Sequence, residues 1–245
     1  MNIIKESAHN FLMGFSWVSS FAKRYHRTGL NEDVEGISQI IDFYSQGVNL
    51  AGADILEIGP GQTLGVGTTL MKKFGSHQSC VDITRYFSDE ECLSKGIQYK
   101  IYNGVDLPFQ DHSFDCIISS DVFEHVRKPR ELLLECRRVL RPQGVFKARI
   151  DLRDHFYLAD QKNWHHCRQY SDQLWWQMTS NRSNFINRLL SSQWESLFHE
   201  TGFQIKEISA EKVDPTNFID KPYLKVILAA DLATWRLDVT LVKSQ

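Results

Sequence analysis

The stretch ADILEIGPG at residues 53–61 decides the fold. A short apolar-rich run that ends in glycines is typical of a buried strand of a parallel sheet, followed by a sharp turn. Gly59 and Gly61 allow that turn and let the backbone approach a ligand closely. Two glycines alone are weak evidence for any particular ligand. The dinucleotide fingerprint needs a third glycine where Leu64 stands, and a phosphate-binding P-loop needs a Gly-Lys-Ser/Thr that is absent here.

Strand patterns and helical patterns alternate after this stretch, which predicts a parallel sheet with right-handed crossovers. Helices are expected at 64–74, from Pro129 to the Pro-Gln-Gly at 142–144, at 191–202 before Gly202, and around 221–230. The last strand alternates apolar and polar residues and should finish the sheet. The further strands are expected at HQSCVDIT (77–84), KIYNGVD (100–106), SFDCIISSD (113–121), GVFKARIDL (144–152), FQIKEIS (203–209) and RLDVTLVK (236–243).

The first fifty residues carry helical spacing and are expected to form a cover or an edge of the same domain. The apolar residues that recur with this spacing are Phe11, Leu12, Phe15, Val18, Phe21, Val34, Ile37, Ile40, Ile41 and Tyr44.

Composition places the chain among ordinary globular proteins: it has 245 residues, of which 42% are hydrophobic and 24% charged. The net charge of -2 gives no electrostatic reason to expect a nucleic acid or a membrane as partner. We expect no membrane span and no signal peptide, and therefore a cytoplasmic location. Five cysteines without CxxC spacing are expected to be reduced, buried thiols.

An acidic residue follows the second expected strand. Asp82 lies 23 residues after Gly59, close to the spacing at which a carboxylate accepts hydrogen bonds from ribose hydroxyls. The pattern therefore favours a nucleoside ligand.

Four motifs occur in order: LEIGPG (56–61), NGVDLPF (103–109), SFDCIISSDVFEHV (113–126) and RVLRPQG (138–144). With them, residues 50–150 resemble the class I S-adenosylmethionine-dependent methyltransferases, of the type 11-like subgroup. The resemblance implies an α/β fold: a Rossmann-like, seven-stranded, mostly parallel sheet with helices on both faces, an antiparallel last strand and a helical lid. It also implies S-adenosyl-L-methionine as cofactor and S-adenosyl-L-homocysteine as product.

The resemblance also implies roles for single residues. Asp82 would hold the ribose and Ile83 would pack on the adenine. Asn103 stands where the family usually has the Asp that accepts from the adenine amino group, so we assign Asn103 to adenine, with Asp106 as the alternative. The remaining cofactor-binding candidates are Glu57, Gly59 and Gly61 at the methionine end, Gly104 in the loop, and Ser120 and Asp121 near the methyl group.

Two of these carboxylates have structural alternatives: Glu57 as a satisfied strand-end acid and Asp121 as a helix cap. A second departure from the family is Gln143 in place of a glycine, in what we interpret as a surface turn away from the chemistry.

The methyl acceptor should lie beyond the carboxyl ends of the strands, under an aromatic insertion at 151–190. The substrate-binding candidates there are Asp151, Trp164, Arg168 and Tyr170. A hydroxyl acceptor needs a general base, for which histidine is suited. His155 is the favoured candidate; His165 and His166 can also be lid-packing residues, and His125 can position the cofactor instead. We expect no metal site.

The sequence therefore predicts one class I methyltransferase domain over 1–245. Its parts are an N-terminal helical cover (1–50), a cofactor-binding core (51–150), the acceptor-site lid (151–190), and a C-terminal helix and strands (191–245). The expected activity is methyl transfer to oxygen or nitrogen of a small molecule such as a sugar or a natural-product intermediate, by a monomer or homodimer. The alternatives are a non-catalytic cofactor-binding partner subunit, and a methyltransferase that acts on protein or RNA.

Overall fold

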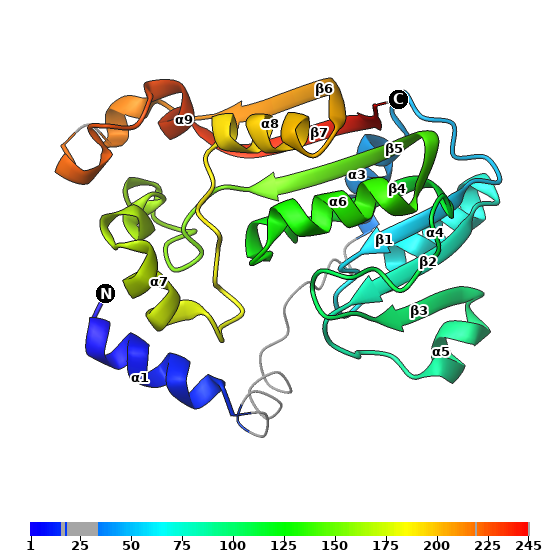
Figure 1. Ribbon diagram of the computed structural model, residues 1–245, viewed down its shortest axis with the longest axis horizontal. Helices are drawn as coiled ribbons and strands as arrows, with labels where there is room; N and C mark the ends of the chain where they lie inside the picture. Colours follow the sequence, from blue (N-terminus) through cyan, green and yellow to red (C-terminus); the bar gives the residue numbers. More distant parts are fainter. Residues whose placement is uncertain (16–17, 19–33, 219, 245) are drawn as a thin grey trace.

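A seven-stranded sheet forms the centre of the computed structural model (Figure 1), in the order β3-β2-β1-β4-β5-β7-β6. Neighbouring strands are parallel except that β7 is antiparallel to both β5 and β6. The structure describes residues 1–15, 18, 34–218 and 220–244, so Phe21 lies outside the described residues. The strands are β1 (Asp54–Ile58), β2 (His77–Asp82), β3 (Ile97–Ile101), β4 (Phe114–Ser120), β5 (Leu140–Asp151), β6 (Phe203–Lys212) and β7 (Thr234–Lys243).

Helices cover both faces of the sheet, which confirms the predicted Rossmann-like fold. On one face, α3 and α4 bury Ile41 and Leu70 against Ile55 of β1 and Ile118 of β4. On the other, α6 and α8 pack apolar side chains such as Trp194 against the same strands and against β7. The helices are α1 (Ile3–Met13), α3 (Val34–Ser45), α4 (Gly65–Phe74), α5 (Asp89–Ser94), α6 (Pro129–Val139), α7 (Asp172–Thr179), α8 (Ser191–Glu200) and α9 (Ala229–Ala233).

Two predicted helices differ from the structure. The helix that begins at Pro129 ends at Val139 rather than at 142–144, because Leu140 already pairs with Phe114 of β4. The pattern at 221–230 gives only the 3-10 turn η5 (Pro222–Leu224) and the short α9, whose apolar residues pack into a small separate cluster. The other 3-10 turns are η1 (Phe123–His125), η2 (Gln161–Asn163), η3 (His166–Gln169) and η4 (Pro215–Phe218).

Gln143 lies where the pairing of β5 with β4 is interrupted, between Leu140 and Val145. It is exposed and has φ +64°, a left-handed conformation in which a side chain is strained. The position is at the surface, as expected, but it lies in an irregular part of β5 rather than in a turn, and its backbone explains why a glycine suits it.

The two N-terminal helices have different places. α3 belongs to the layer that covers the sheet, whereas α1 lies against α7 of the insertion, far along the chain (Figure 1). Asn10 holds this contact: its Nδ2 donates to Gln177 O at 2.9 Å and to Ser180 Oγ at 3.1 Å, and its Oδ1 accepts from Asn181 N at 2.7 Å. Buried Asn10 thus joins α1 to the end of α7.

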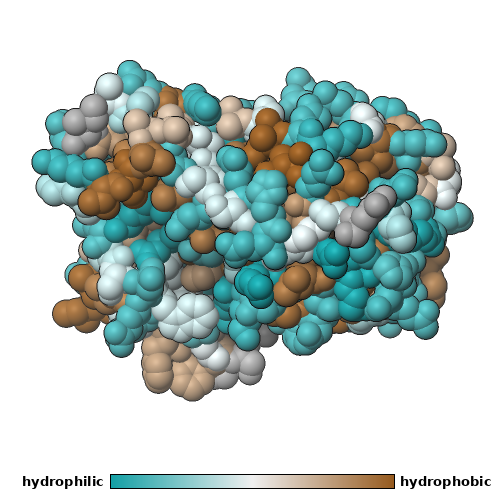
Figure 2. Space-filling model, turned by 45° about the horizontal axis from the view of Figure 1, so that its top comes forward, coloured by the Kyte–Doolittle hydropathy of each residue, from teal (hydrophilic) through white to brown (hydrophobic). Residues whose placement is uncertain are grey.

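All five thiols are free and buried, as predicted. No helix within the described ranges is long and apolar enough to cross a bilayer. On the face shown in Figure 2, hydrophobic residues form separate patches in a mainly hydrophilic surface.

Candidate active site

The turn after β1 leaves bare backbone at the carboxyl end of the sheet. Gly59 has φ +75° and Gly61 has φ +65°. A Cβ atom at Gly59 would lie 2.5 Å from Cγ2 of Val122, so the turn also packs against the chain that follows β4. Glycine is therefore required at position 59 by both conformation and space.

Glu57 lies just before this turn and is almost fully buried, with 7% of its surface exposed. Its carboxylate is near Gly67 in α4 and accepts a weak hydrogen bond from Cys80 Sγ at 3.7 Å. Burial raises the pKa of Glu57 to about 7. A carboxyl group that titrates near neutrality is typical of functional sites, although structural acids can behave in the same way.

The end of β2 presents a carboxylate beside an exposed apolar side chain. Asp82 is mostly buried and accepts a hydrogen bond from Thr84 N at 2.9 Å. Ile83 next to it is 64% exposed, and a Cβ at Gly104 would lie 3.7 Å from its Cγ2. An acceptor for hydroxyl groups therefore adjoins an uncovered apolar surface.

The loop after β3 uses Asn103 differently from our expectation. Asn103 Oδ1 accepts from Val105 N at 2.9 Å and from Asp106 N at 2.8 Å, while its Nδ2 donates to Asp106 Oδ2 at 2.6 Å. An amide oxygen has two lone pairs, and both are used here. Asn103 shapes the turn, and Asp106 becomes the better hydrogen-bond acceptor for a ligand at this loop.

At the end of β4, Ser120 and Tyr44 of α3 share a hydrogen bond of 2.8 Å between their hydroxyl groups. Asp121 follows with φ +54°. Desolvation of the Asp121 carboxyl, together with the negative charge of Asp151, raises the pKa of Asp121 to about 6. Tyr44 was expected only as part of a helical stripe, and nothing in its spacing distinguished it as a site residue.

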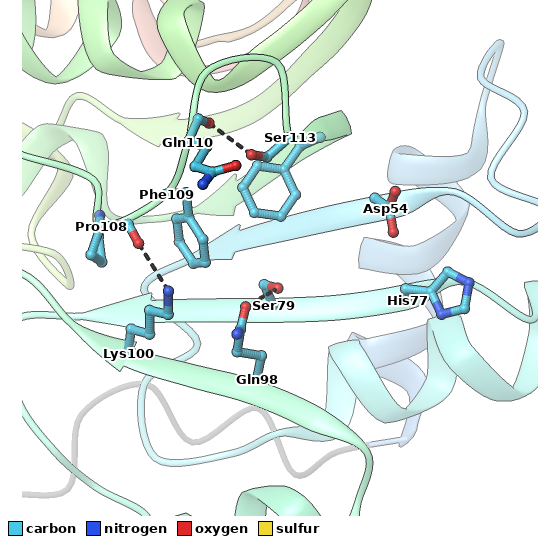
Figure 3. Close-up of a pocket in the computed structure, with 10 residues that line it drawn as sticks. Asp54, His77, Ser79, Gln98, Lys100, Pro108, Phe109, Gln110 and Ser113 are labelled. Atoms are coloured by element: carbon cyan, nitrogen blue, oxygen red, sulfur yellow. Dashed lines mark hydrogen bonds between the residues drawn. The ribbon is translucent and has the colours of Figure 1, made fainter.

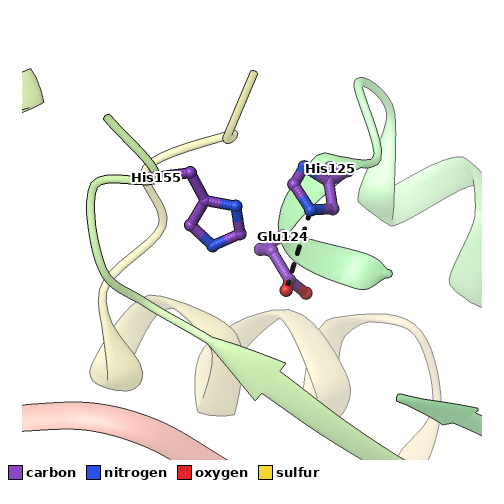
Figure 4. A group of neighbouring side chains, drawn as sticks. All are labelled: Glu124, His125 and His155. Carbon is purple, nitrogen blue, oxygen red and sulfur yellow. Dashed lines mark ion pairs between the residues drawn. The ribbon is translucent and has the colours of Figure 1, made fainter. Parts of the chain in front are cut away.

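Beyond β4 and β5, three side chains meet: Glu124 and His125 on η1, and His155 on the loop after β5 (Figure 4). The rings of His125 and His155 are 4.7 Å apart between centroids, and His125 Nε2 lies 4.0 Å from Glu124 Oε1. Burial lowers the pKa of both histidines, that of His155 to about 4. Burial also raises the pKa of Glu124, a residue that the sequence motif contained but that we had not singled out.

Asp151 borders this group, with its Oδ2 3.7 Å from His155 Nε2. Arg153 neutralises Asp151 through a two-pronged ion pair at 2.6–3.1 Å and itself lies over the rings of Trp164 and Trp235. Of the four substrate candidates, Asp151 is therefore next to His155, and Trp164 is connected to Asp151 through Arg153.

The other lid candidates lie elsewhere. His165 is buried, and one ring nitrogen is 2.9 Å from Leu232 O. His166 Nδ1 lies 3.8 Å from Asp154, outside the His125–His155 group. Arg168 donates to Arg188 O at 2.6 Å, and Tyr170 stacks on Trp175. These contacts give His165 and Arg168 positions inside the lid.

A hollow of about 450 Å³ lies over β1, β2 and β3, away from the glycine turn and the histidine cluster (Figure 3). Its walls include His77, Gln98 and Lys100, and Lys100 Nζ donates to Pro108 O at 2.9 Å across one side. It contains none of the glycines after β1 and neither histidine of the cluster, so we do not assign the ligand site to it.

Three observations together define a class of protein: the sheet order, a glycine turn after β1, and an acid at the end of β2. This is the class I arrangement of nucleoside-binding α/β proteins. Residues 56–148 match the family described as “Methyltransferase domain”. Over these residues the chain is similar to methyltransferase domains, and its fold is that of the class I, S-adenosylmethionine-dependent methyltransferases.

A ubiquinone biosynthesis O-methyltransferase of Xanthomonas oryzae pv. oryzae is 28% identical over 110 residues, which are 42% of this chain and 45% of that protein. The chain thus aligns with about half the length of the curated relatives it matches.

Among solved structures, phosphoethanolamine N-methyltransferase 2 of Haemonchus contortus has TM-score 0.60 and 19% identity over 92% of this chain and 57% of that one. A chain of the complex between the Haloferax volcanii Trm112 methyltransferase activator and a methyltransferase has TM-score 0.57 and 15% identity over 86% and 93%. At identities below 20%, these two similarities show only that the fold is shared.

The residues present fit the cofactor of this class. A nucleoside needs an acceptor for its ribose and an apolar surface for its base, and Asp82 and Ile83 offer both beside one another. The exposed apolar surface of Ile83, with Gly104 next to it, is the kind of place that a planar base covers.

Proposed function

We propose that the protein transfers a methyl group from S-adenosylmethionine to an oxygen or nitrogen of a small molecule. One observation carries the proposal: the cofactor-type residues after β1, β2 and β4 and the group of Glu124, His125 and His155 share one edge of the sheet, next to the insertion. Ligands of open α/β sheets bind at this edge.

In this proposal, Asp82 accepts hydrogen bonds from the ribose, and Ile83 contacts the adenine. Asp106 replaces Asn103 as the acceptor for the adenine amino group, because the Asn103 oxygen is occupied by the turn. The methionine end would lie along the bare backbone of Gly59 and Gly61, and the other residues that border it are Glu57, Gly104, Ser120 and Asp121.

When bound, the cofactor supplies an electrophilic methyl group: the carbon–sulfur bond breaks with its electron pair left on sulfur, and the acceptor atom forms the new bond and loses its proton to water. The chain's own residues orient the acceptor and exclude water. The insertion supplies the walls; of its candidates, Asp151 lies next to His155, and Trp164 packs on the Arg153 that pairs with Asp151. His165 and His166 lie apart from this group and are not needed for the reaction we propose.

Two observations support a small acceptor. The net charge of -2 offers no broad attraction for nucleic acid, and the core matches an O-methyltransferase of ubiquinone biosynthesis.

The test begins with calorimetry of S-adenosylmethionine binding to the wild-type chain, to Asp82→Ala, and to Asp89→Ala on α5 as a control. Asp82→Ala removes charge-assisted hydrogen bonds worth about 1.5–3 kcal/mol. The variant should therefore bind S-adenosylmethionine at least tenfold more weakly than the wild type. Labelled cofactor is then incubated with a metabolite extract and with protein and RNA fractions. Label in a small molecule supports the proposal; label in a macromolecule, or tight binding without any transfer, contradicts it.

A further inference from the structure

We propose that Glu124, His125 and His155 bind one divalent transition-metal ion of the zinc type, beside the place where the acceptor would lie. Each residue offers one ligand atom, and these atoms lie within 4.8 Å of one another. Figure 4 shows the two imidazole rings on either side of the carboxylate. Bonds of about 2.0 Å to one ion require ligand atoms about 3.3 Å apart, so the side chains need to approach one another by up to about 1.5 Å.

Glu124 is buried, the two histidines are half-buried, and several polar atoms of the group lack a hydrogen-bond partner. Neither carboxylate oxygen of Glu124 has a hydrogen-bond partner, nor does His155 Nε2, although Glu124 is only 2% exposed. Burial and the charges of Asp121 and Asp151 raise the pKa of Glu124, and the backbone groups of Glu124 and Asp151 offset this only in part. Buried polar groups normally have a hydrogen-bond partner. Several unpaired polar atoms that face one another therefore indicate that a ligand common to all of them, such as a metal ion, binds there.

The ring of His125 is held in the orientation that a metal ligand needs. Its Nδ1 lies 2.6 Å from Phe185 O, and the carbonyl oxygen can only accept, so Nδ1 carries the proton. Nε2 is then the unprotonated nitrogen, on the side of Glu124. Metal-bound histidines commonly donate their other ring N–H to a backbone carbonyl in this way.

The set of ligands identifies the kind of ion. Two imidazoles and one carboxylate suit zinc or another first-row transition ion and leave coordination positions open. Magnesium and calcium prefer oxygen ligands alone. The role of the ion rests on the proposed function: an acceptor hydroxyl that occupies an open position would lose its proton to water more readily, and its oxygen would be held in place. His155 would then act as a ligand rather than as a general base.

The experiment uses the full chain without an affinity tag, stripped with a chelator and desalted. Elemental analysis after incubation with Zn²⁺ and removal of the excess should find one ion per chain. Titration with Co²⁺ should give visible absorption bands that saturate at one equivalent. His155→Ala and Glu124→Gln should each weaken binding at least tenfold. His77→Ala, which changes an exposed histidine at the start of β2, should leave it unaltered.

Thermal unfolding provides a second measurement for the same samples. Zn²⁺ should raise the midpoint of the wild-type chain and have little effect on Glu124→Gln, whose metal-free form should be as stable as wild type or more stable because a buried acid is removed. Failure to bind one equivalent, or equal binding by both variants and wild type, overturns the proposal. Because these measurements need neither cofactor nor acceptor, they are separate from the test of methyl transfer.

Discussion

Glu57 should make the stability of the protein depend on pH in a predictable direction. Its pKa is about 7 in the folded chain and close to 4.5 when unfolded, because burial disfavours the charged form. The folded state therefore holds a proton between these values that the unfolded state has lost. The stabilisation is fully present below about pH 4.5 and disappears as the pH rises through 7. A difference of about 2.5 pKa units corresponds to about 3 kcal/mol.

Glu57→Gln removes this titration while keeping the size of the side chain. Urea unfolding at intervals from pH 4.5 to 8.5 should show that the wild-type free energy of unfolding, relative to that of Glu57→Gln, falls by about 3 kcal/mol over the range. Glu90→Gln, at an exposed position on α5, serves as the control and should follow the wild type. If the difference between wild type and Glu57→Gln is the same at every pH, the buried-carboxylate reasoning is wrong.

Three further predictions concern the backbone and the lid. Gln143→Gly should stabilise the chain by about 1 kcal/mol in urea unfolding, since φ is +64°; a loss of stability would contradict the strain argument. Gly59→Ala should cost about 2–4 kcal/mol by the same measurement, and Val122→Ala in the same chain should restore part of it; independent effects of the two changes would argue against their contact. Asn10→Ala should increase hydrogen exchange in α1 and α7 but not in β1 or β4, whereas unchanged exchange in α7 would show that the contact is unimportant.

The centre of the sheet was predictable because β1 and β4 are buried on both faces and end in turn residues. Runs such as ILEI at 55–58 and CIIS at 116–119 have no other favourable place in a globular chain. The end of α6 was not predictable, because the helical pattern continues through Leu140 and only strand pairing with Phe114 decides where it stops. The apolar stripe of α1 was misleading as well: Phe11 and Leu12 are more than half exposed, and the polar Asn10 makes the contact.

The candidate site was predictable where spacing along the chain fixes position. Asp82, Gly59 and Gly61 fall at strand ends, and parallel strand ends meet at one edge. The positions of the other candidate residues depend on tertiary contacts, which the sequence does not reveal. His165 and His166 are close in sequence to the aromatic residues of the insertion, but they lie apart from the cluster of Glu124, His125 and His155. Glu124 is distinguished only by its proximity to the two histidines, one of which is distant in sequence.

The order of strands also sets the order in which the sheet can be completed. β7 comes after every other strand in the chain, yet it lies between β5 and β6. Until residues 234–243 have been made, β5 offers an unpaired edge and β6 has no partner in the sheet. Exposed strand edges of an incomplete chain invite pairing with other chains. During synthesis, the stage before β7 inserts should therefore be the one at which this protein aggregates most readily.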